Sequence, residues 1–210
     1  MLAPWYVRSR PLDGKTGAEI FQALYGQSAI ADAVLSNGQG WQAIATLLES
    51  PAQLPPDMPQ ARLARYSICA GPPRSDGDRP LLWTPPVGEI LPMLTVRLNT
   101  PQPTTMLLDD QGQPLSSPLE PFAGGWLGWL GYDLAWEIEA LPAKNADVLP
   151  FPVAFWYEPA TFAILDHAEQ RLWLAASAPD QLDVMEQAIA TSSSTQPSSP
   201  MFAQALELAS

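Results

Sequence analysis

Pro121 to Glu139 reads PFAGGWLGWLGYDLAWEIE, and this stretch is the starting point for predicting the fold. Its apolar run between Phe122 and Tyr132 would place large side chains on both faces of an extended chain, which is typical of a strand buried on two sides. Glycine recurs at every third position, at Gly125, Gly128 and Gly131. Glycine inside a strand indicates that another segment approaches too closely for a Cβ. We therefore predict a crowded core strand.

After Gly131 the continuous apolar run ends and polar residues occur among the apolar ones. This change of pattern predicts a short helix, which Leu141-Pro142 would end. The glycines do not match a phosphate-binding loop, which needs GxGxxG before a long helix or a GK[ST] ending. A membrane helix built on the GxxxG of Gly124 and Gly128 would meet Asp133 too soon.

The rest of the chain alternates short apolar segments with turn signals, which favours an α+β fold over repeated βαβ units. We expect a mostly antiparallel, twisted sheet with helices packed on it. Strands are predicted at 5–11, 29–35, 43–49, 61–70, 81–84, 151–166 with an interruption at Pro159, and 171–176. Helices are predicted from a Thr16 cap to Gly26, at 88–98 and at 180–190, and loops at 51–60 and 99–119. Residues 1–190 would form one domain, and 191–210 a linker and tail.

Composition limits the possible partners. The formal net charge of −12, with only ten Lys and Arg residues, argues against nucleic acid or an anionic membrane surface. The sequence shows no signal peptide and no segment of membrane-spanning length, so we expect a soluble, cytoplasmic protein.

Four residue types that often take part in catalysis or ligand binding are interpreted here as structural. Cys69 lies in an apolar run and is expected to be a small buried core residue. Arg62 and Arg65 are interpreted as exposed strand-edge charges rather than an anion site. Asp166-His167 is interpreted as a hairpin turn, because adjacent strand residues point to opposite faces and cannot form a catalytic dyad. His167 is the only histidine, and no carboxylates surround it at metal-ligand spacing.

Two separated blocks, PFAGGWLGWLGYDLAWEIEALP and VLPFPVAFWYEPATFAILDH, resemble the amino-terminal domain of component I of anthranilate synthase and of aminodeoxychorismate synthase, the enzyme of the para-aminobenzoate branch. A second match is the order LLES, a proline-rich gap, and then ARYSICAGPP. The resemblance extends from about Trp5 to about Ala190. It implies the fold of the amino-terminal subdomain of aminodeoxychorismate synthase.

The LLES segment, Leu47 to Ser50, carries the ligand that the resemblance implies. In the anthranilate synthase branch this motif helps to form the pocket for feedback-inhibiting L-tryptophan, which assigns Leu48, Glu49 and Ser50 to such a pocket. A carboxylate can pair with an α-ammonium group, and a hydroxyl can add a hydrogen bond. The alternative is a strand end with a solvated Glu49 and a turn-forming Ser50 before Pro51.

The resemblance also implies a role in tryptophan or folate biosynthesis. In the resembled enzymes a chorismate-binding half, which holds Mg²⁺, follows this kind of domain, whereas this chain ends at the linker. We therefore expect a regulatory and scaffolding domain that is catalytically inert alone, with no catalytic residue, metal ligand or cofactor of its own. Its expected partners are the chorismate-binding half, as a separate chain or lost, the glutamine amidotransferase subunit, and L-tryptophan. A free-standing L-tryptophan sensor and a degenerate relic are the alternatives, and the branch stays open.

Overall fold

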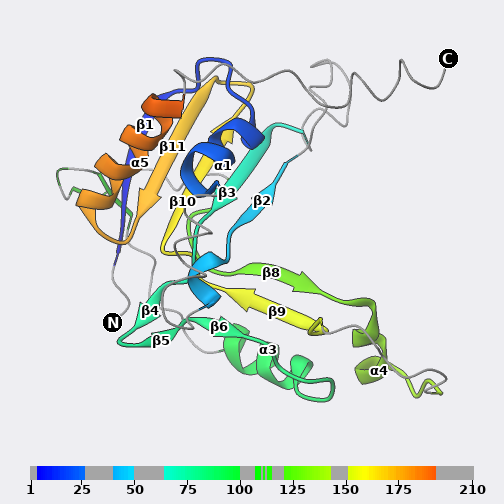
Figure 1. Cartoon of the computed structure of the whole chain (residues 1–210). Coiled ribbons are helices and arrows are strands. Elements are labelled where there is room, and N and C mark those ends of the chain that lie inside the picture. Colours follow the sequence, from blue (N-terminus) through cyan, green and yellow to red (C-terminus); the bar gives the residue numbers. More distant parts are fainter. Residues whose placement is uncertain are drawn as a thin grey trace, which may run out of the picture.

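The structure is a computed structural model that describes residues 4–26, 40–49, 64–99, 107–109, 111, 113–114, 121–142 and 151–192. Its larger sheet has six strands in the order β2-β3-β10-β11-β1-β7 (Figure 1). The bounds of these strands are β1 Trp5–Pro11, β2 Thr46–Leu48, β3 Tyr66–Ala70, β7 Leu107–Asp109, β10 Thr161–Asp166 and β11 Arg171–Ala176. Every neighbouring pair is antiparallel except β1 and β7, which are parallel.

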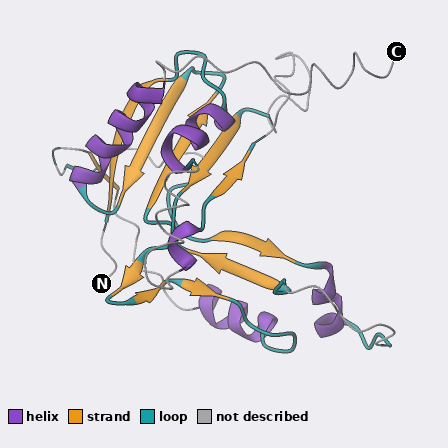
Figure 2. Ribbon diagram, viewed as in Figure 1, coloured by secondary structure: helices purple, strands orange, loops and turns teal. Residues whose placement is uncertain are grey.

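A smaller sheet has three antiparallel strands in the order β6-β9-β8, and a two-stranded ribbon pairs β4 with β5. These strands are β4 Ser75–Asp76, β5 Arg79–Pro80, β6 Leu82–Trp83, β8 Leu127–Leu130 and β9 Ala154–Tyr157. The helices are α1 Gly17–Tyr25, α3 Ile90–Asn99, α4 Ala135–Ile138 and α5 Pro179–Ser192, with 3-10 turns at Gly40–Ala43 and Tyr132–Leu134. Figure 2 shows the helices and strands of the larger and the smaller sheet. The predicted α+β class with mostly antiparallel strands is confirmed.

Helices α1 and α5 lie side by side on one face of the larger sheet (Figure 1). A cluster of buried hydrophobic side chains, which includes Ile20, Leu174 and Leu182, lies between these helices and the sheet. The opposite face of the sheet carries a second cluster, in which Trp5 and Phe162 meet Tyr157 of the smaller sheet. The larger sheet is therefore buried on both faces.

Helix α1 begins where the sequence predicts it. The Thr16 hydroxyl accepts a hydrogen bond from the Glu19 N–H at 3.2 Å, and the Glu19 carboxylate accepts one from the Thr16 N–H at 2.8 Å. This reciprocal capping box satisfies two of the free donors at the start of the helix. Gly26 follows the last helical residue.

The predicted core strand at 122–132 is wrong. The structure has only the short β8 there, at the edge of the smaller sheet, and three of its four residues are exposed. The predicted crowding is confirmed at Gly128, where a Cβ would collide with the Phe155 carbonyl of β9. Gly128 permits close pairing of strands, whereas Trp129 beside it is half exposed. An apolar run alone does not distinguish a strand inside a core from one on an apolar surface.

Most other predicted elements are present with shifted ends. The helices at 88–98 and 180–190 and the strands at 5–11, 81–84 and 171–176 are confirmed, as is the break at Pro159, which separates β9 from β10. The strand at 43–49 is shorter than predicted because a 3-10 turn precedes it, and the loop at 99–119 contains β7. The predicted strand at 29–35 and Arg62 lie outside the described residues.

A buried ion pair joins the two sheets. The Arg74 guanidinium lies 2.9 Å from the Glu158 carboxylate, and these side chains are only 6% and 5% exposed. Arg74 also donates to the Ser177 hydroxyl at 2.7 Å and the Pro4 carbonyl at 3.0 Å. Its guanidinium stacks 3.7 Å above the Trp5 ring. Burial raises the pKa of the Glu158 carboxyl and lowers the pKa of the Arg74 guanidinium, even though each charge favours the other.

Replacing one member of this pair should be costly. Glu158→Ala leaves a buried guanidinium without its counter-ion, so we expect the free energy of unfolding to fall by about 3–5 kcal/mol, measured by urea denaturation. Glu169→Ala is the matched control, because this carboxylate is 62% exposed in its ion pair with Arg65, and should cost no more than about 1 kcal/mol. Equal effects of the two changes would show that the buried pair does not anchor the fold.

Candidate ligand-binding site

The structure places two of the three predicted site residues. Leu48 is the last residue of β2 and is half exposed, and Glu49 follows it directly. Ser50 lies outside the described residues. Because β2 pairs with β3 in a register that sets Leu48 opposite Ile68, Glu49 comes level with Ser67 on the face that α1 covers.

The Glu49 carboxylate lies against the first turn of α1. Its Oε1 accepts a hydrogen bond from the Ala18 N–H at 3.3 Å. Gly17 permits this approach, since a Cβ there would lie 2.6 Å from Glu49 Oε1 and 3.0 Å from Ser67 Cβ. A carboxylate at a helix start is stabilised by the free N–H groups and by the helix dipole. Glu49 therefore accepts from the first turn of α1, a contact that neither the ligand interpretation nor the strand-end interpretation included.

One oxygen of Glu49 stays available for other contacts. Within the described part of the chain, the only hydrogen bond to this carboxylate is the one to Oε1. A second donor, such as an ammonium group, could bind to Oε2 while α1 keeps its contact. The position of Glu49 is thus compatible with the ligand role that the resemblance implies, and that role stays a prediction.

One residue close to Glu49, Ser67, was missed from the sequence. The Ser67 hydroxyl, which is fully buried, lies 2.8 Å from the His167 Nε2, and Cys69 follows on the same strand face. Burial, together with the nearby negative charge of Glu49, raises the pKa of the Cys69 thiol to about 12. Cys69 is therefore the small buried core residue that was predicted, and its thiol stays protonated at neutral pH. The signal for Ser67 was the strand pairing, which the sequence alone does not give.

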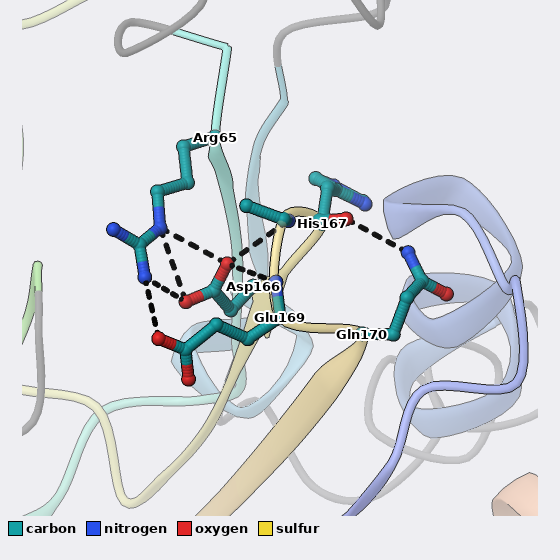
Figure 3. A network of polar contacts seen from close by, with 6 residues as sticks. Arg65, Asp166, His167, Glu169 and Gln170 are labelled. Carbon is teal, nitrogen blue, oxygen red and sulfur yellow. Dashed lines mark hydrogen bonds and ion pairs between the residues drawn. The ribbon is translucent and has the colours of Figure 1, made fainter. Parts of the chain in front are cut away.

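His167 belongs to the turn between β10 and β11, so the predicted hairpin is confirmed. Figure 3 shows the polar network at this turn. The Asp166 carboxylate accepts hydrogen bonds from Arg65 Nε at 3.0 Å and Nη2 at 2.6 Å, and from the Ala168 and Glu169 N–H groups. Arg65 also lies 3.2 Å from the Glu169 carboxylate. Arg65 was expected to be an exposed edge charge, but it is an anchor for this hairpin.

Among the described residues, no three His, Cys, Asp or Glu side chains lie close enough together to hold a metal ion. In the same residues, no helix is both long and apolar enough to cross a membrane.

The pKa of Asp166 gives a prediction with a defined pH dependence. Burial alone would raise this pKa, but the hydrogen bonds from Arg65 and the turn outweigh burial and hold it below the ordinary value. A lowered folded-state pKa stabilises the fold above the unfolded value of about 3.9, and this contribution is lost as the pH falls through the folded-state pKa. Asp166→Asn should therefore lower the free energy of unfolding by about 2 kcal/mol at pH 7, and by progressively less as the pH falls below the unfolded value and through the folded-state pKa, in urea titrations. A pH-independent loss would contradict this account.

Comparisons with known proteins find relatives that are named as component I of anthranilate synthase or as similar to it. No protein-family model matches it. An anthranilate synthase component I-like protein of Synechocystis sp. is 46% identical over 189 residues, which are 90% of this chain and 34% of that protein. Anthranilate synthase component 1 of Thermus thermophilus is 35% identical over 86 residues, or 40% of this chain and 19% of that protein. The same component of Cereibacter sphaeroides is 36% identical over 64 residues, or 30% and 13%.

The chain thus spans about a third of the length of the Synechocystis protein and less of the other two. The identity to the Synechocystis protein runs through nearly all of this chain rather than through one motif. Over nine tenths of its length, this chain is therefore related to the anthranilate synthase component I family.

Proposed function

We propose that this chain is the regulatory and scaffolding amino-terminal domain of a component I synthase, acting with a chorismate-binding half and not catalytic alone. The whole assembly would convert chorismate to anthranilate or to 4-amino-4-deoxychorismate, with Mg²⁺ held by the chorismate-binding half and ammonia supplied by a glutamine amidotransferase subunit. The observation that carries the proposal is the 46% identity over 189 residues to a component I-like protein, of which the matched region is 34%.

The surface of the smaller sheet supports a packing partner. Large apolar side chains are exposed along β8, the segment that follows it, and the start of the segment leading to β9. We call this surface the apolar strip, and its members are Trp129, Leu130, Tyr132, Trp136, Ile138, Leu141 and Phe151. Tyr132 is 89% exposed. Several exposed aromatic and large aliphatic side chains on neighbouring segments are typical of an interaction surface, and aromatic residues are typical anchors of such interfaces.

The sensor alternative is supported by one observation, the Glu49 Oε2 beside α1, which accepts no hydrogen bond from the described residues. In a synthase, L-tryptophan bound at this oxygen would act as a feedback inhibitor across the interface with the catalytic half. In a free-standing sensor, the same oxygen would bind L-tryptophan without any partner. The two proposals differ in whether binding needs the second half, so one titration separates them.

The scaffold proposal predicts a complex that depends on the apolar strip. Mixed with the region of the Synechocystis relative that it does not match, this chain should form a one-to-one complex in analytical ultracentrifugation. Trp129→Asp should weaken that complex by at least tenfold, because an interface aromatic is replaced by a charge. Val184→Asp, on the distant helix α5 and similarly exposed, is the matched control and should have no effect.

With chorismate, Mg²⁺ and ammonia, the chain alone should make neither product, and the mixture with the second half should make one of them. Product from the isolated chain would refute the inert-domain proposal. If Trp129→Asp left the complex intact, the interface would have to lie outside the apolar strip.

Calorimetry with L-tryptophan tests the Glu49 role. We expect no heat from the isolated chain and measurable binding once the second half is added, with Glu49→Gln weakening that binding by about tenfold because a charge-assisted hydrogen bond is lost. Asp109→Asn is the matched control. Its carboxylate also accepts from backbone N–H groups, those of Gln111 at 2.9 Å and Gln113 at 2.7 Å, and Asp109 is not part of the apolar strip. Heat from the isolated chain would favour the free-standing sensor instead.

A further inference from the structure

Strand β8 has a free edge. It pairs with β9 on one side and is the last strand of the smaller sheet on the other (Figure 1). The Gly131 N–H donates to the Val153 carbonyl, and in an antiparallel pair alternate residues direct both backbone groups to the same side. Gly131, Trp129 and Leu127 therefore face β9. The N–H and C=O groups of the residues between them, Gly128 and Leu130, point away from the sheet.

These outward backbone groups are accessible to a partner. Gly128 is exposed, and Leu130 is 48% exposed. Neither residue has a hydrogen bond across the outer edge from the described part of the chain. Charged residues and proline commonly protect such edges, but β8 reads LGWL and contains neither. An exposed, apolar strand edge of this kind is a template for pairing with another strand.

The sequence of β8 fits a second copy of itself. Two identical strands can pair antiparallel about a two-fold axis, the commonest symmetry of protein dimers. The residues with outward groups form the hydrogen-bonded pairs, so Gly128 of each copy lies opposite Leu130 of the other, and each pair exchanges both of its N–H···O=C bonds. An axis through Gly128 would instead set Leu130 opposite Trp126, outside β8. The axis must therefore pass beside Trp129 if all the outward groups are to pair within the strand.

This register sets Trp129 directly opposite Trp129 of the second copy. Because the pair is not hydrogen-bonded, the two Cα atoms would lie about 4.5 Å apart with their side chains in contact, and such aromatic pairs stabilise strand pairing. The ring is already held in place, since it stacks on Phe155 with centroids 4.3 Å apart and its Nε1 donates to the Pro152 carbonyl at 3.3 Å. It is also 47% exposed, so pairing would remove apolar surface from water.

The net charge of the chain does not oppose contact at this edge. Although the formal charge is −12, no charged residue occurs from Pro121 to Tyr132. Like charges directly opposite each other destabilise a strand pair, and the paired β8 strands bring none together.

We propose that the free chain forms a two-fold symmetric dimer in which the β8 edges of two copies pair antiparallel, joining the two smaller sheets into one continuous sheet. The proposal does not rest on the synthase role. Because β8 is part of the apolar strip, a catalytic half that docks there would displace the second copy. The dimer is then the state of the chain without that half.

Sedimentation equilibrium of the isolated full chain tests the dimer. The mass should rise with concentration from that of one chain to twice that value. Leu130→Pro removes the outward N–H and leaves the donors to β9 in place, so it should weaken dimerisation at least tenfold, because each dimer loses two hydrogen bonds. Leu130→Val is the matched control, since it keeps the N–H and an apolar side chain, and it should dimerise like the unaltered chain. Circular dichroism melts show whether each variant is folded.

A disulfide tests the register. Trp129→Cys places two thiols in the pair on the axis, where a Cα separation of about 4.5 Å lies within disulfide range, so mild oxidation should give a cross-linked dimer on non-reducing electrophoresis. Leu130→Cys is the matched control. Its two copies are diagonal neighbours about 7–8 Å apart, which is beyond that range, so it should cross-link far less. The unaltered chain should not cross-link, because Cys69 is buried.

Three results would overturn the proposal. The first is a chain that stays monomeric at every concentration. The second is a dimer that folded Leu130→Pro leaves as strong as Leu130→Val does, which would place the contact away from β8. The third is equal cross-linking of Trp129→Cys and Leu130→Cys, which would exclude the two-fold register.

Discussion

The buried ion pair between Arg74 and Glu158 is the contact on which the arrangement of the two sheets depends. Glu158 follows the last residue of β9 in the smaller sheet and comes just before β10 in the larger one. Arg74 follows β3 and reaches back to the segment before β1 through the Pro4 carbonyl. Backbone hydrogen bonds flank the pair, with the Arg74 N–H donating to the Glu158 carbonyl and the Glu158 N–H donating to the Leu81 carbonyl. Together with Ser177, to which Arg74 also donates, five chain segments meet at one buried pair of charges.

Such a pair serves geometry more than stability. Both charges lose hydration, and the opposite shifts of the two pKa values show that burial opposes each charged form. A hydrophobic pair of similar size would fill the same volume, but it would not fix where the segments cross. The Trp5 ring, stacked on the Arg74 guanidinium and packed edge-on against Phe162, extends this fixed point into the core between the sheets. The apolar strip of the smaller sheet is thus held at a defined position relative to α1 and Glu49.

Local sequence signals predicted the elements well, because caps, breakers and turns act within a few residues. The Thr16 capping box, the Pro159 break and the Asp166-His167 turn are examples, and the structure confirms each. Burial was harder to predict. The PFAGGWLGWLGYD run reads as a core strand, yet β8 lies at an edge, while the true centre is formed by β10 and β11. The same apolar residue types occur in a core and on a surface that contacts a partner, so the sequence alone does not distinguish the two.

The candidate site divides in the same way. Glu49 was found through a motif, but its neighbours Gly17 and Ser67 come from two other segments that only the packing of α1 and the pairing of β2 with β3 bring together. Arg65 was misjudged for the same reason, since its partner Asp166 is 101 positions away in the sequence. The free edge of β8 could not be predicted either, because the position of a strand within a sheet depends on pairings between distant segments.

The crossing between the sheets is double, and this limits how the molecule can move. Residues 71–74 and 158–160 run beside each other, joined by a bridge between Pro73 and Pro159 and by the bond from the Ala160 N–H to the Pro72 carbonyl. Proline fixes φ, so neither strap can swivel freely about its own backbone. Because the two connections run side by side, they resist rotation of one sheet relative to the other. A force applied to the smaller sheet would therefore move the larger sheet with it, instead of bending the two connecting segments.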